Sequence, residues 1–305
     1  MPEFISNSEN FALESQQVRR AFDKAARDYD AAAVLQREIA DRLLERLEYM
    51  RISPEHILDL GAGTGYCSRG LAAKYPSATI YAADIAPAML RYAKGSLSWL
   101  RKFKKRDKFI VTDANSLAFA DNSMDIIFSN LTLQWCPQLE QVFKELKRVL
   151  KPGGMLLFST FGPDTLKELR NSWLKVDDNI HVNHFIDLHD VGDAMLQAGF
   201  SDPVMDMEMI TVTYKDVKSI MRDLKQIGAH NVNQGRARAL TGKGRLLKLQ
   251  QEYEVYRSQG VLPVSHEVIY GNAWCAENKN SQPQTNKPEA RSEFYISIDA
   301  IGKQK

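Results

Sequence analysis

The sequence of 305 residues is long enough to bury one large core, or a core with a cap. Because 44% of its residues are hydrophobic and 26% charged, global disorder is excluded. A formal net charge of +2 is too small to predict a partner. The three cysteines lack metal-ligand spacing, no apolar run approaches a membrane span, and the first residues do not form a signal peptide. We therefore expect a cytoplasmic protein with reduced, buried thiols.

The first 50 residues predict a helical lid. Apolar residues recur at helical spacing over residues 12–48, with Val18 and Phe22 on one face and Ile39 and Leu43 on another. Tyr29 lies between the two predicted helices. Two interpretations stay open: a passive cover over one end of a sheet, or a lid whose Tyr29 and Gln36 face a ligand.

A glycine loop follows the first predicted strand. The run ILDLGAGTG at residues 57–65 predicts a buried strand, a tight turn and the start of a helix. Its glycines are Gly61, Gly63 and Gly65, and Asp59 stands just before them. Tyr66 occupies the place where the dinucleotide fingerprint requires glycine, so a ligand without a phosphate is favoured over NAD.

Acidic residues end the next two predicted strands. Asp84 follows the glycines by about 20 residues, where a carboxylate accepts hydrogen bonds from both hydroxyls of a ribose. Asp113 ends the third strand and could meet an adenine amino group, and the fourth strand ends at Asn130. A fifth strand follows the turn at residues 151–154, so strands and helices alternate as in βαβ units.

This order of elements resembles the class I S-adenosylmethionine-dependent methyltransferases. The resemblance implies an α/β, Rossmann-like fold with a seven-stranded, mostly parallel sheet. It also implies S-adenosylmethionine as cofactor, converted to S-adenosylhomocysteine. The expected cofactor-binding residues are Gln36, Asp59, Gly61, Ala62, Gly63, Gly65, Asp84, Ile85, Met89, Asp113, Ala114 and Asn130.

The second half of the chain predicts a cap and a tail. Residues 203–214 and 264–274 are expected to be the last two strands, an antiparallel pair, with helices at 216–229 and 243–258 between them. The methyltransferase domain then spans residues 51–275, with cap insertions at about 163–186 and 215–260, and a mobile tail covers 276–305. His181, His184 and His189 do not have the spacing of a zinc motif, so no metal is expected. A basic stretch at 101–106 is expected to end the second core helix, as a solvated end or a docking patch.

Two further motifs narrow the resemblance. The run FDKAARDY at residues 22–29, followed by Leu35 and Gln36, is similar to the N-terminal signature of the malonyl-acyl-carrier-protein O-methyltransferases, which open biotin synthesis. The segments SNL at 129–131, LQWC at 133–136 and RDLK at 222–225 match that family too. The absence of a Pro-Pro pair after the fourth strand and the scarcity of base-stacking aromatics argue against a nucleic-acid substrate.

The narrower resemblance implies methyl transfer to the free carboxylate of a malonyl group on acyl carrier protein. A carboxylate is already a nucleophile at neutral pH, so no general base is required. We expect Tyr29 and Arg222 to be catalytic, with Arg222 a buried cation that holds the carboxylate. Arg170 is the second candidate, and with Gln134 and Trp135 it forms the expected substrate-binding set. The residues expected to dock the acidic carrier protein are Arg236, Arg238, Lys243 and Arg245.

Three alternatives stay open. The segments FG at 161–162, DTL at 164–166 and ELR at 168–170 are shared with complex I assembly factors of methyltransferase fold that hydroxylate protein arginines. An arginine at position 222 favours the carboxylate substrate over that activity. The others are a small-molecule carboxyl or C-methyltransferase and a cofactor-binding scaffold without turnover. Neither a nucleic-acid partner nor a membrane partner is expected.

Overall fold

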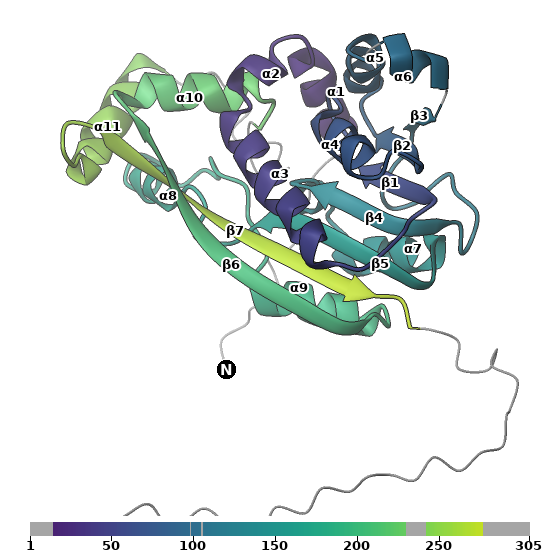
Figure 1. Cartoon of the computed structure of the whole chain (residues 1–305). Coiled ribbons are helices and arrows are strands. Elements are labelled where there is room, and N and C mark those ends of the chain that lie inside the picture. The colour runs from purple at the N-terminus through teal and green to yellow at the C-terminus, as the bar shows by residue number, and fades with distance from the viewer. Residues whose placement is uncertain (1–14, 98, 105, 230–241, 277–305) are drawn as a thin grey trace, which may run out of the picture.

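The structure is a computed structural model that describes residues 15–97, 99–104, 106–229 and 242–276. A seven-stranded sheet lies at its centre, in the order β3-β2-β1-β4-β5-β7-β6 (Figure 1). Its strands are β1 (His56–Leu60), β2 (Thr79–Asp84), β3 (Asp107–Val111), β4 (Met124–Asn130), β5 (Leu150–Phe161), β6 (Ser201–Tyr214) and β7 (Leu262–Trp274). Strand β7 pairs antiparallel with β5 and β6, whereas the other neighbours pair parallel. The expected mostly parallel, Rossmann-like sheet is confirmed.

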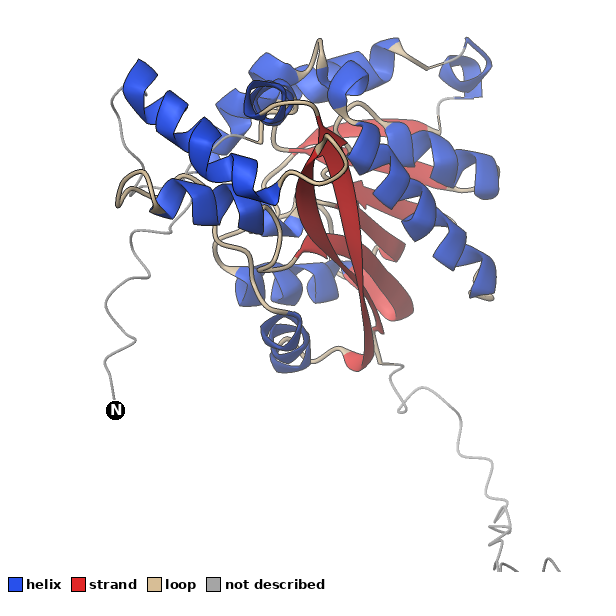
Figure 2. Ribbon diagram, turned by 90° about the vertical axis from the view of Figure 1, so that its left-hand side faces the viewer, coloured by secondary structure: helices blue, strands red, loops and turns tan. Residues whose placement is uncertain are grey.

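Helices cover both faces of the sheet, as Figure 2 shows. The described helices are α1 (Ser15–Ala25), α2 (Tyr29–Ala32), α3 (Val34–Arg46), α4 (Tyr66–Lys74), α5 (Pro87–Gly95), α6 (Trp99–Lys104), α7 (Leu139–Val149), α8 (Lys167–Leu174), α9 (Leu188–Gln197), α10 (Val217–Gln226) and α11 (Lys243–Tyr253). Short 3-10 turns are η2 (Leu47–Tyr49), η3 (Leu133–Trp135) and η4 (Glu254–Tyr256). Apolar residues of α3 and α4 pack on one face, and those of α7 and α9 on the other.

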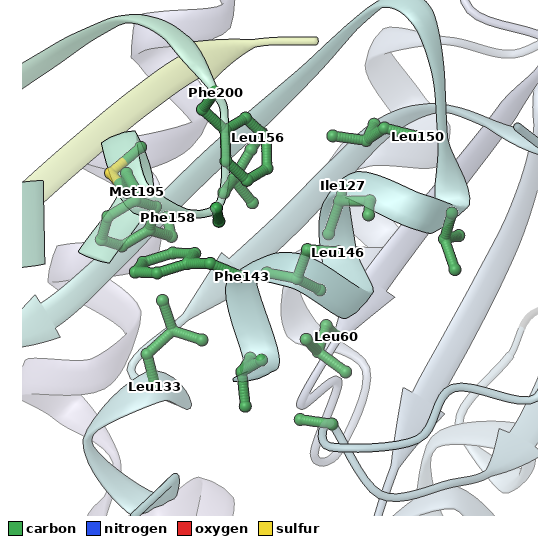
Figure 3. Packing of buried hydrophobic residues seen from close by; sticks show 14 of the residues in the cluster. Leu60, Ile127, Leu133, Phe143, Leu146, Leu150, Leu156, Phe158, Met195 and Phe200 are labelled. Carbon is green, nitrogen blue, oxygen red and sulfur yellow. The ribbon is translucent and has the colours of Figure 1, made fainter. Parts of the chain in front are cut away.

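The central strands are apolar on both faces because both faces are covered. In β1, Ile57 packs toward α3 and α4, while Leu58 and Leu60 pack toward α7 and α9. Figure 3 shows the second of these layers, where the Phe143 ring lies 5.8 Å from the Phe158 ring between centroids. Burying each large apolar side chain contributes about 1.5–3 kcal/mol, so these two layers fix the sheet that carries the site.

Strands β6 and β7 form the expected antiparallel pair, and α10 and α11 lie between them in sequence. A third apolar cluster joins α8, α10 and α11 to the start of β7. Figure 1 shows α10 and α11 beyond the ends of β6 and β7, with α10 next to α2. The cap segments therefore lie near the N-terminal helices, although 184 residues of sequence lie between the end of α2 at Ala32 and the start of α10 at Val217.

Two expectations at the level of elements differ from the structure. The described residues 15–46 form three helices, since a break at residues 26–28 lets Tyr29 start the short α2. The basic stretch at 101–106 does not end the second core helix, because α5 stops at Gly95 and a separate α6 follows. Arg101 there pairs with Asp107 at the start of β3. The tail from residue 277 onward and the arginines at 236 and 238 lie outside the described residues.

The structure bears on three further expectations. All three cysteines are free and buried. No described helix combines the length and apolar character needed to cross a membrane. Within the described ranges, no group of three His, Cys, Asp or Glu residues is placed to hold a metal ion.

Candidate active site

A cavity of about 960 Å³ opens at the carboxyl ends of the parallel strands. Its walls come from the N-terminal helices, the glycine loop, the ends of β2 and β4, and the cap. The expected site residues that line it are Tyr29, Gln36, Gly61, Gly63, Asp84, Ile85, Met89, Asp113, Ala114, Asn130, Gln134, Trp135 and Arg222. Thirteen residues chosen from six separate stretches of sequence thus share one cavity.

The glycine loop brings backbone close to the cavity. Gly61 has a φ of 73°, and a Cβ there would lie 1.8 Å from the Thr132 hydroxyl oxygen. The backbone N–H groups of Gly61 and Ala62 both donate to the Ala83 carbonyl oxygen. Only glycine tolerates this conformation and this contact. The loop is therefore held against the end of β2, where Asp84 follows.

Asp84 is buried at the base of the cavity. Its Oδ2 accepts a hydrogen bond of 2.9 Å from the Gly63 N–H, and its Oδ1 accepts one of 2.8 Å from the Ala86 N–H. Burial raises the pKa of Asp84 to about 6, although these two donors favour the charged form. The carboxylate thus fixes the glycine loop and keeps spare lone pairs for a ligand.

Asp113 organises the neighbouring part of the wall. Its Oδ1 accepts hydrogen bonds from the Asn115 backbone N–H at 2.9 Å and from Asn115 Nδ2 at 2.8 Å. The amide oxygen of Asn115 is buried and has no hydrogen-bond partner among the described residues. An unpaired acceptor at a cavity wall is suited to a donor on a ligand. Asn115 is a site residue that the sequence analysis did not name.

The N-terminal helices are tied to the glycine loop and to α5. The Thr64 hydroxyl donates to Asp30 over 2.5 Å, and the Ala88 N–H donates to Asp23 over 2.7 Å. Tyr29 lies between these two contacts in sequence and lines the cavity. Burial and the nearby Asp84 carboxylate raise the pKa of Tyr29, so the phenol stays protonated at neutral pH. Its hydroxyl is therefore a hydrogen-bond donor.

The segment after β4 supplies the opposite wall. Asn130 Oδ1 accepts from the Ser159 hydroxyl at 2.7 Å, and Asn130 Nδ2 donates to the Gln36 carbonyl oxygen at 3.1 Å. Gln134 accepts a hydrogen bond from Thr160 at 3.3 Å. The Trp135 ring packs edge-on against an aromatic ring of α1, with 5.4 Å between centroids. These contacts join the wall to α1 and to α3.

Among the residues that the structure describes, three cations line the cavity: Lys24 of α1, and Arg222 and Lys225 of α10. All three are exposed, so the expectation of a buried Arg222 is wrong. The buried face of α10 is formed by Val217 and Ile220. Arg222 is two positions beyond Ile220, which is about 200° around the helix, and so it lies on the solvent side. The cavity is therefore cationic where it meets solvent.

Comparisons with known proteins agree with this geometry. Residues 58–158 match a family model described as a methyltransferase domain. A malonyl-acyl-carrier-protein O-methyltransferase of Gallionella capsiferriformans is 49% identical over 266 residues, which cover 87% of this chain and 92% of that protein. One from Methylovorus is 45% identical over 280 residues, covering 91% and 95%. The chain belongs to this family.

A solved structure supports the fold alone. The YcgJ protein of Bacillus subtilis is 14% identical to this family member and superposes with a TM-score of 0.54, covering 78% of this chain and 99% of that one. The family and the fold inferred from sequence are both shown.

Four expected residues of this methyltransferase lie off the cavity: Asp59, Ala62, Gly65 and Arg170. Asp59 is buried beneath the loop, where it accepts a hydrogen bond from the Ser68 hydroxyl of α4. Burial raises the pKa of Asp59 to about 7, although the hydrogen bond from Ser68 acts to lower it. Arg170 donates two hydrogen bonds of 2.8 Å to the carbonyl oxygens of Pro163 and Thr165, and burial lowers its pKa. Both residues support the site without lining it.

The structure describes two of the four residues predicted to dock the carrier protein. Lys243 and Arg245 are exposed on α11 and do not line the cavity. Arg245 lies 3.7 Å from Asp177. Arg236 and Arg238 fall outside the described residues.

The end of β5 and the cap add an apolar wall that the sequence analysis did not predict. Its members are Phe161, Leu166, Leu169, Trp173, Val182 and Phe185. His181 stacks on Trp173 with 3.6 Å between ring centroids and shares a hydrogen bond of 2.8 Å with Asp177. His266 of β7 also lines the cavity. Residues 175–187 have no helical or strand periodicity, so no local pattern could have placed this segment against α8.

Proposed function

We propose that this chain transfers a methyl group from S-adenosylmethionine to the free carboxylate of a malonyl group carried on acyl carrier protein. The observation that carries the proposal is one continuous cavity with two different ends. Its inner end joins the glycine loop to Asp84 and Asp113, and its outer end carries Arg222 and Lys225. Family membership supports the same substrate class.

The inner end fits a nucleoside cofactor. The Asp84 carboxylate can accept from two ribose hydroxyls, and the glycine at position 61 lets the loop backbone line the cavity while it packs directly on Thr132. The buried, unpaired oxygen of Asn115 can accept from an adenine amino group beside Asp113. When bound, S-adenosylmethionine supplies the methyl group on a sulfonium sulfur, which keeps the electron pair as the carbon–sulfur bond breaks. The protein has to hold the acceptor in line with that bond.

The outer end fits an anionic acceptor. A malonyl carboxylate has an ordinary pKa near 4 and is ionised at neutral pH, so the chain need not remove a proton from it. The exposed cations Arg222 and Lys225 can attract and orient the carboxylate without binding it so tightly that its nucleophilicity is lost. The protonated hydroxyl of Tyr29 can donate to a second oxygen of the bound groups. Each of these roles is part of the proposal.

The N-terminal helices and the cap are proposed to enclose the reaction. In this division residues 1–50 form a lid, residues 51–275 the methyltransferase domain with its cap insertions, and residues 276–305 a tail. Closing the lid excludes water and brings Tyr29 and Gln36 onto the ligands. The exposed cations of α11, Lys243 and Arg245, are proposed to meet the acidic carrier protein, together with Arg236 and Arg238.

The product suggests where the reaction belongs. A methyl ester removes the charge from the end of a malonyl group, so that fatty-acid elongation can accept it as a growing chain. We therefore place the reaction at the start of biotin synthesis, in the cytoplasm.

The test is methyl transfer from labelled S-adenosylmethionine to malonyl-carrier protein, followed by treatment with base. We expect a base-labile methyl ester on the carrier. Protein arginine hydroxylation would consume no methyl donor, and a scaffold without turnover would bind the cofactor in a titration yet transfer nothing. A label found elsewhere, or none, would refute the proposal.

A further inference from the structure

The two faces of α11 differ sharply in how they are packed. Leu249 and Tyr253 form the inner face and are fully buried against the cap. The Tyr253 hydroxyl also donates a hydrogen bond of 2.9 Å to the Pro263 carbonyl oxygen at the start of β7. Leu247 is two positions from Leu249, which is about 200° around the helix. The packing of the inner face therefore holds Leu247 on the outside of the molecule.

Three apolar side chains at this corner of the cap are exposed to solvent. Leu247 is 58% exposed, and Val255, in the turn that continues α11, is 68% exposed. Leu174, the last residue of α8, is 65% exposed. Its neighbour Lys175 pairs with Glu252 at 3.3 Å, so the end of α8 lies beside the second half of α11. Exposed apolar side chains that gather on one surface indicate an interaction site, whereas scattered ones do not.

The charge around these apolar side chains is positive. Residues 243–257 contain two glutamates, and each is held in an ion pair by a cation of this chain. Lys243 and Lys248 flank Leu247 on the helix, and both are exposed. The α11 patch is defined here as the exposed apolar and basic residues of this corner: Leu174, Lys243, Leu247, Lys248 and Val255.

An apolar centre with a basic rim is complementary to a partner that has an apolar centre and an acidic rim. The rim charges attract such a partner, and burial of the apolar centre supplies affinity that exposed charges do not. A second copy of this chain, in a two-fold contact, would set one basic rim against another, and like charges repel each other. The acidic carrier protein of the acceptor has the charge that this patch requires.

We propose that the α11 patch is the docking surface for the carrier protein, with Leu247 packing between apolar side chains of an acidic helix of that protein. The inner face of α11 packs on Leu169 and Trp173 of α8, and both of these line the cavity. A carrier bound to the patch therefore lies next to the cap wall of the cavity. The inference rests on the function proposed above, and it adds an apolar contact to the proposed attraction between charges.

The experiment measures kcat/KM with two acceptors, malonyl-carrier protein and malonyl-pantetheine, which lacks the carrier. Leu247→Ala removes most of the apolar contact, and Leu247→Met keeps its area. Lys243→Ala removes a charge of the rim instead. Leu196→Ala is the matched control, because Leu196 is 54% exposed on α9, which lies apart from α11 in Figure 1. Each variant is assayed at low and at high salt.

Leu247→Ala should lower kcat/KM for malonyl-carrier protein at least about fivefold. The value for malonyl-pantetheine should stay within about twofold of that of the wild type. The loss with the carrier should persist at high salt because an apolar contact is not screened, whereas the loss caused by Lys243→Ala should shrink. Leu247→Met and Leu196→Ala should behave as the wild type.

Equal losses with both acceptors would make Leu247 a support of the cap, and no loss with the carrier would place docking elsewhere. Either result overturns the inference while the methyl transfer proposed above stands. The patch would be a contact between two copies if the wild type sediments as a dimer and Leu247→Ala as a monomer. It would be a lipid-binding surface if phosphatidylglycerol vesicles bind the wild type but not Leu247→Ala.

A wild-type protein that methylates neither acceptor would refute the proposed function but not, by itself, the docking surface. Titration with unacylated carrier protein then tests the contact without turnover. Binding at least about fivefold weaker in Leu247→Ala than in the wild type supports the docking surface. Equal affinity, or no binding to either protein, overturns it.

Discussion

The Asp84 side chain combines two tasks that a substitution can separate. Asp84→Ala removes the acceptors for two ribose hydroxyls, so affinity for S-adenosylmethionine should fall at least about tenfold. It also frees the N–H groups of Gly63 and Ala86, so some loss of thermal stability is expected. Titration calorimetry and a melting curve measure the two effects. A dissociation constant equal to that of the wild type would remove Asp84 from the cofactor site.

The Asp59 carboxyl makes stability depend on pH. Its pKa is about 7 in the folded chain and 3.8 in the reference state, because the carboxyl is buried. The folded protein then binds the proton more tightly, so this contribution to stability falls as pH rises between those two values. One pKa unit corresponds to about 1.4 kcal/mol of folding free energy. The stability that Asp59 contributes at low pH, and loses as pH rises, is therefore at most roughly 4 kcal/mol.

Asp59→Asn should remove this dependence. Between about pH 5 and pH 8 the melting temperature of the wild type should fall more than that of the variant, since other titrating groups are common to both. Parallel curves would show that Asp59 titrates normally.

Arg222 is expected to act on the acceptor and not on the cofactor. Arg222→Leu should lower kcat/KM for malonyl-carrier protein at least about tenfold, a loss of roughly 1.4 kcal/mol in transition-state binding. The affinity for S-adenosylmethionine should stay within about twofold of the wild-type value. Lys225→Ala, on the same helix and equally exposed, is the matched comparison. If only Lys225→Ala loses activity, the malonyl carboxylate is oriented by Lys225 and not by Arg222.

In the N-terminal helices, removing the single hydroxyl of Tyr29 should affect turnover. Tyr29→Phe keeps the ring and its packing near Phe22, where the ring centroids are 6.5 Å apart. Turnover should therefore fall by more than stability does, since only a hydrogen-bond donor is lost. Steady-state rates and a melting curve measured on the same sample compare the two. Normal kinetics with a lowered melting temperature would make Tyr29 a packing residue.

Elements could be predicted from the sequence where the signal is local. The glycine loop and Asp84 were placed because a buried strand followed by glycine dictates its own turn. Asp59 was misplaced because alternation along β1 directs it to the face opposite Leu58 and Leu60, under α4. Arg222 was expected to be a buried cation, yet it is exposed, as is its neighbour Met221. The sequence of this ten-residue helix does not by itself fix its rotation, which is set by the packing of Val217 and Ile220.

At the scale of the whole molecule, the cavity wall could only be found in three dimensions. Phe161, Phe185 and His266 come from β5, a loop without periodicity, and β7. No short pattern links residues so far apart in sequence. The order of the strands and the family were predictable because their motifs are contiguous. Contacts between the cap and the lid were not.

The positive charge around the cavity mouth should affect how the enzyme associates with the carrier protein. The exposed cations of α10 and α11 should steer an acidic carrier protein, and salt should screen them over about 10 Å at 0.1 M. Raising salt should therefore increase the KM for malonyl-carrier protein several-fold and change that for malonyl-coenzyme A less. Charge reversal at Lys243 and Arg245 should reproduce the effect for the carrier alone. Equal responses of both thioesters would leave these residues as ordinary surface.

The central claim is that the methyl group goes to the free carboxylate of the malonyl group. The most direct measurement compares malonyl-carrier protein with acetyl-carrier protein, which lacks that carboxylate, as acceptors of labelled methyl under identical conditions. The account predicts label on the malonyl carrier that base releases as methanol, and none on the acetyl carrier. Equal labelling of both carriers, or label that resists base, would contradict it.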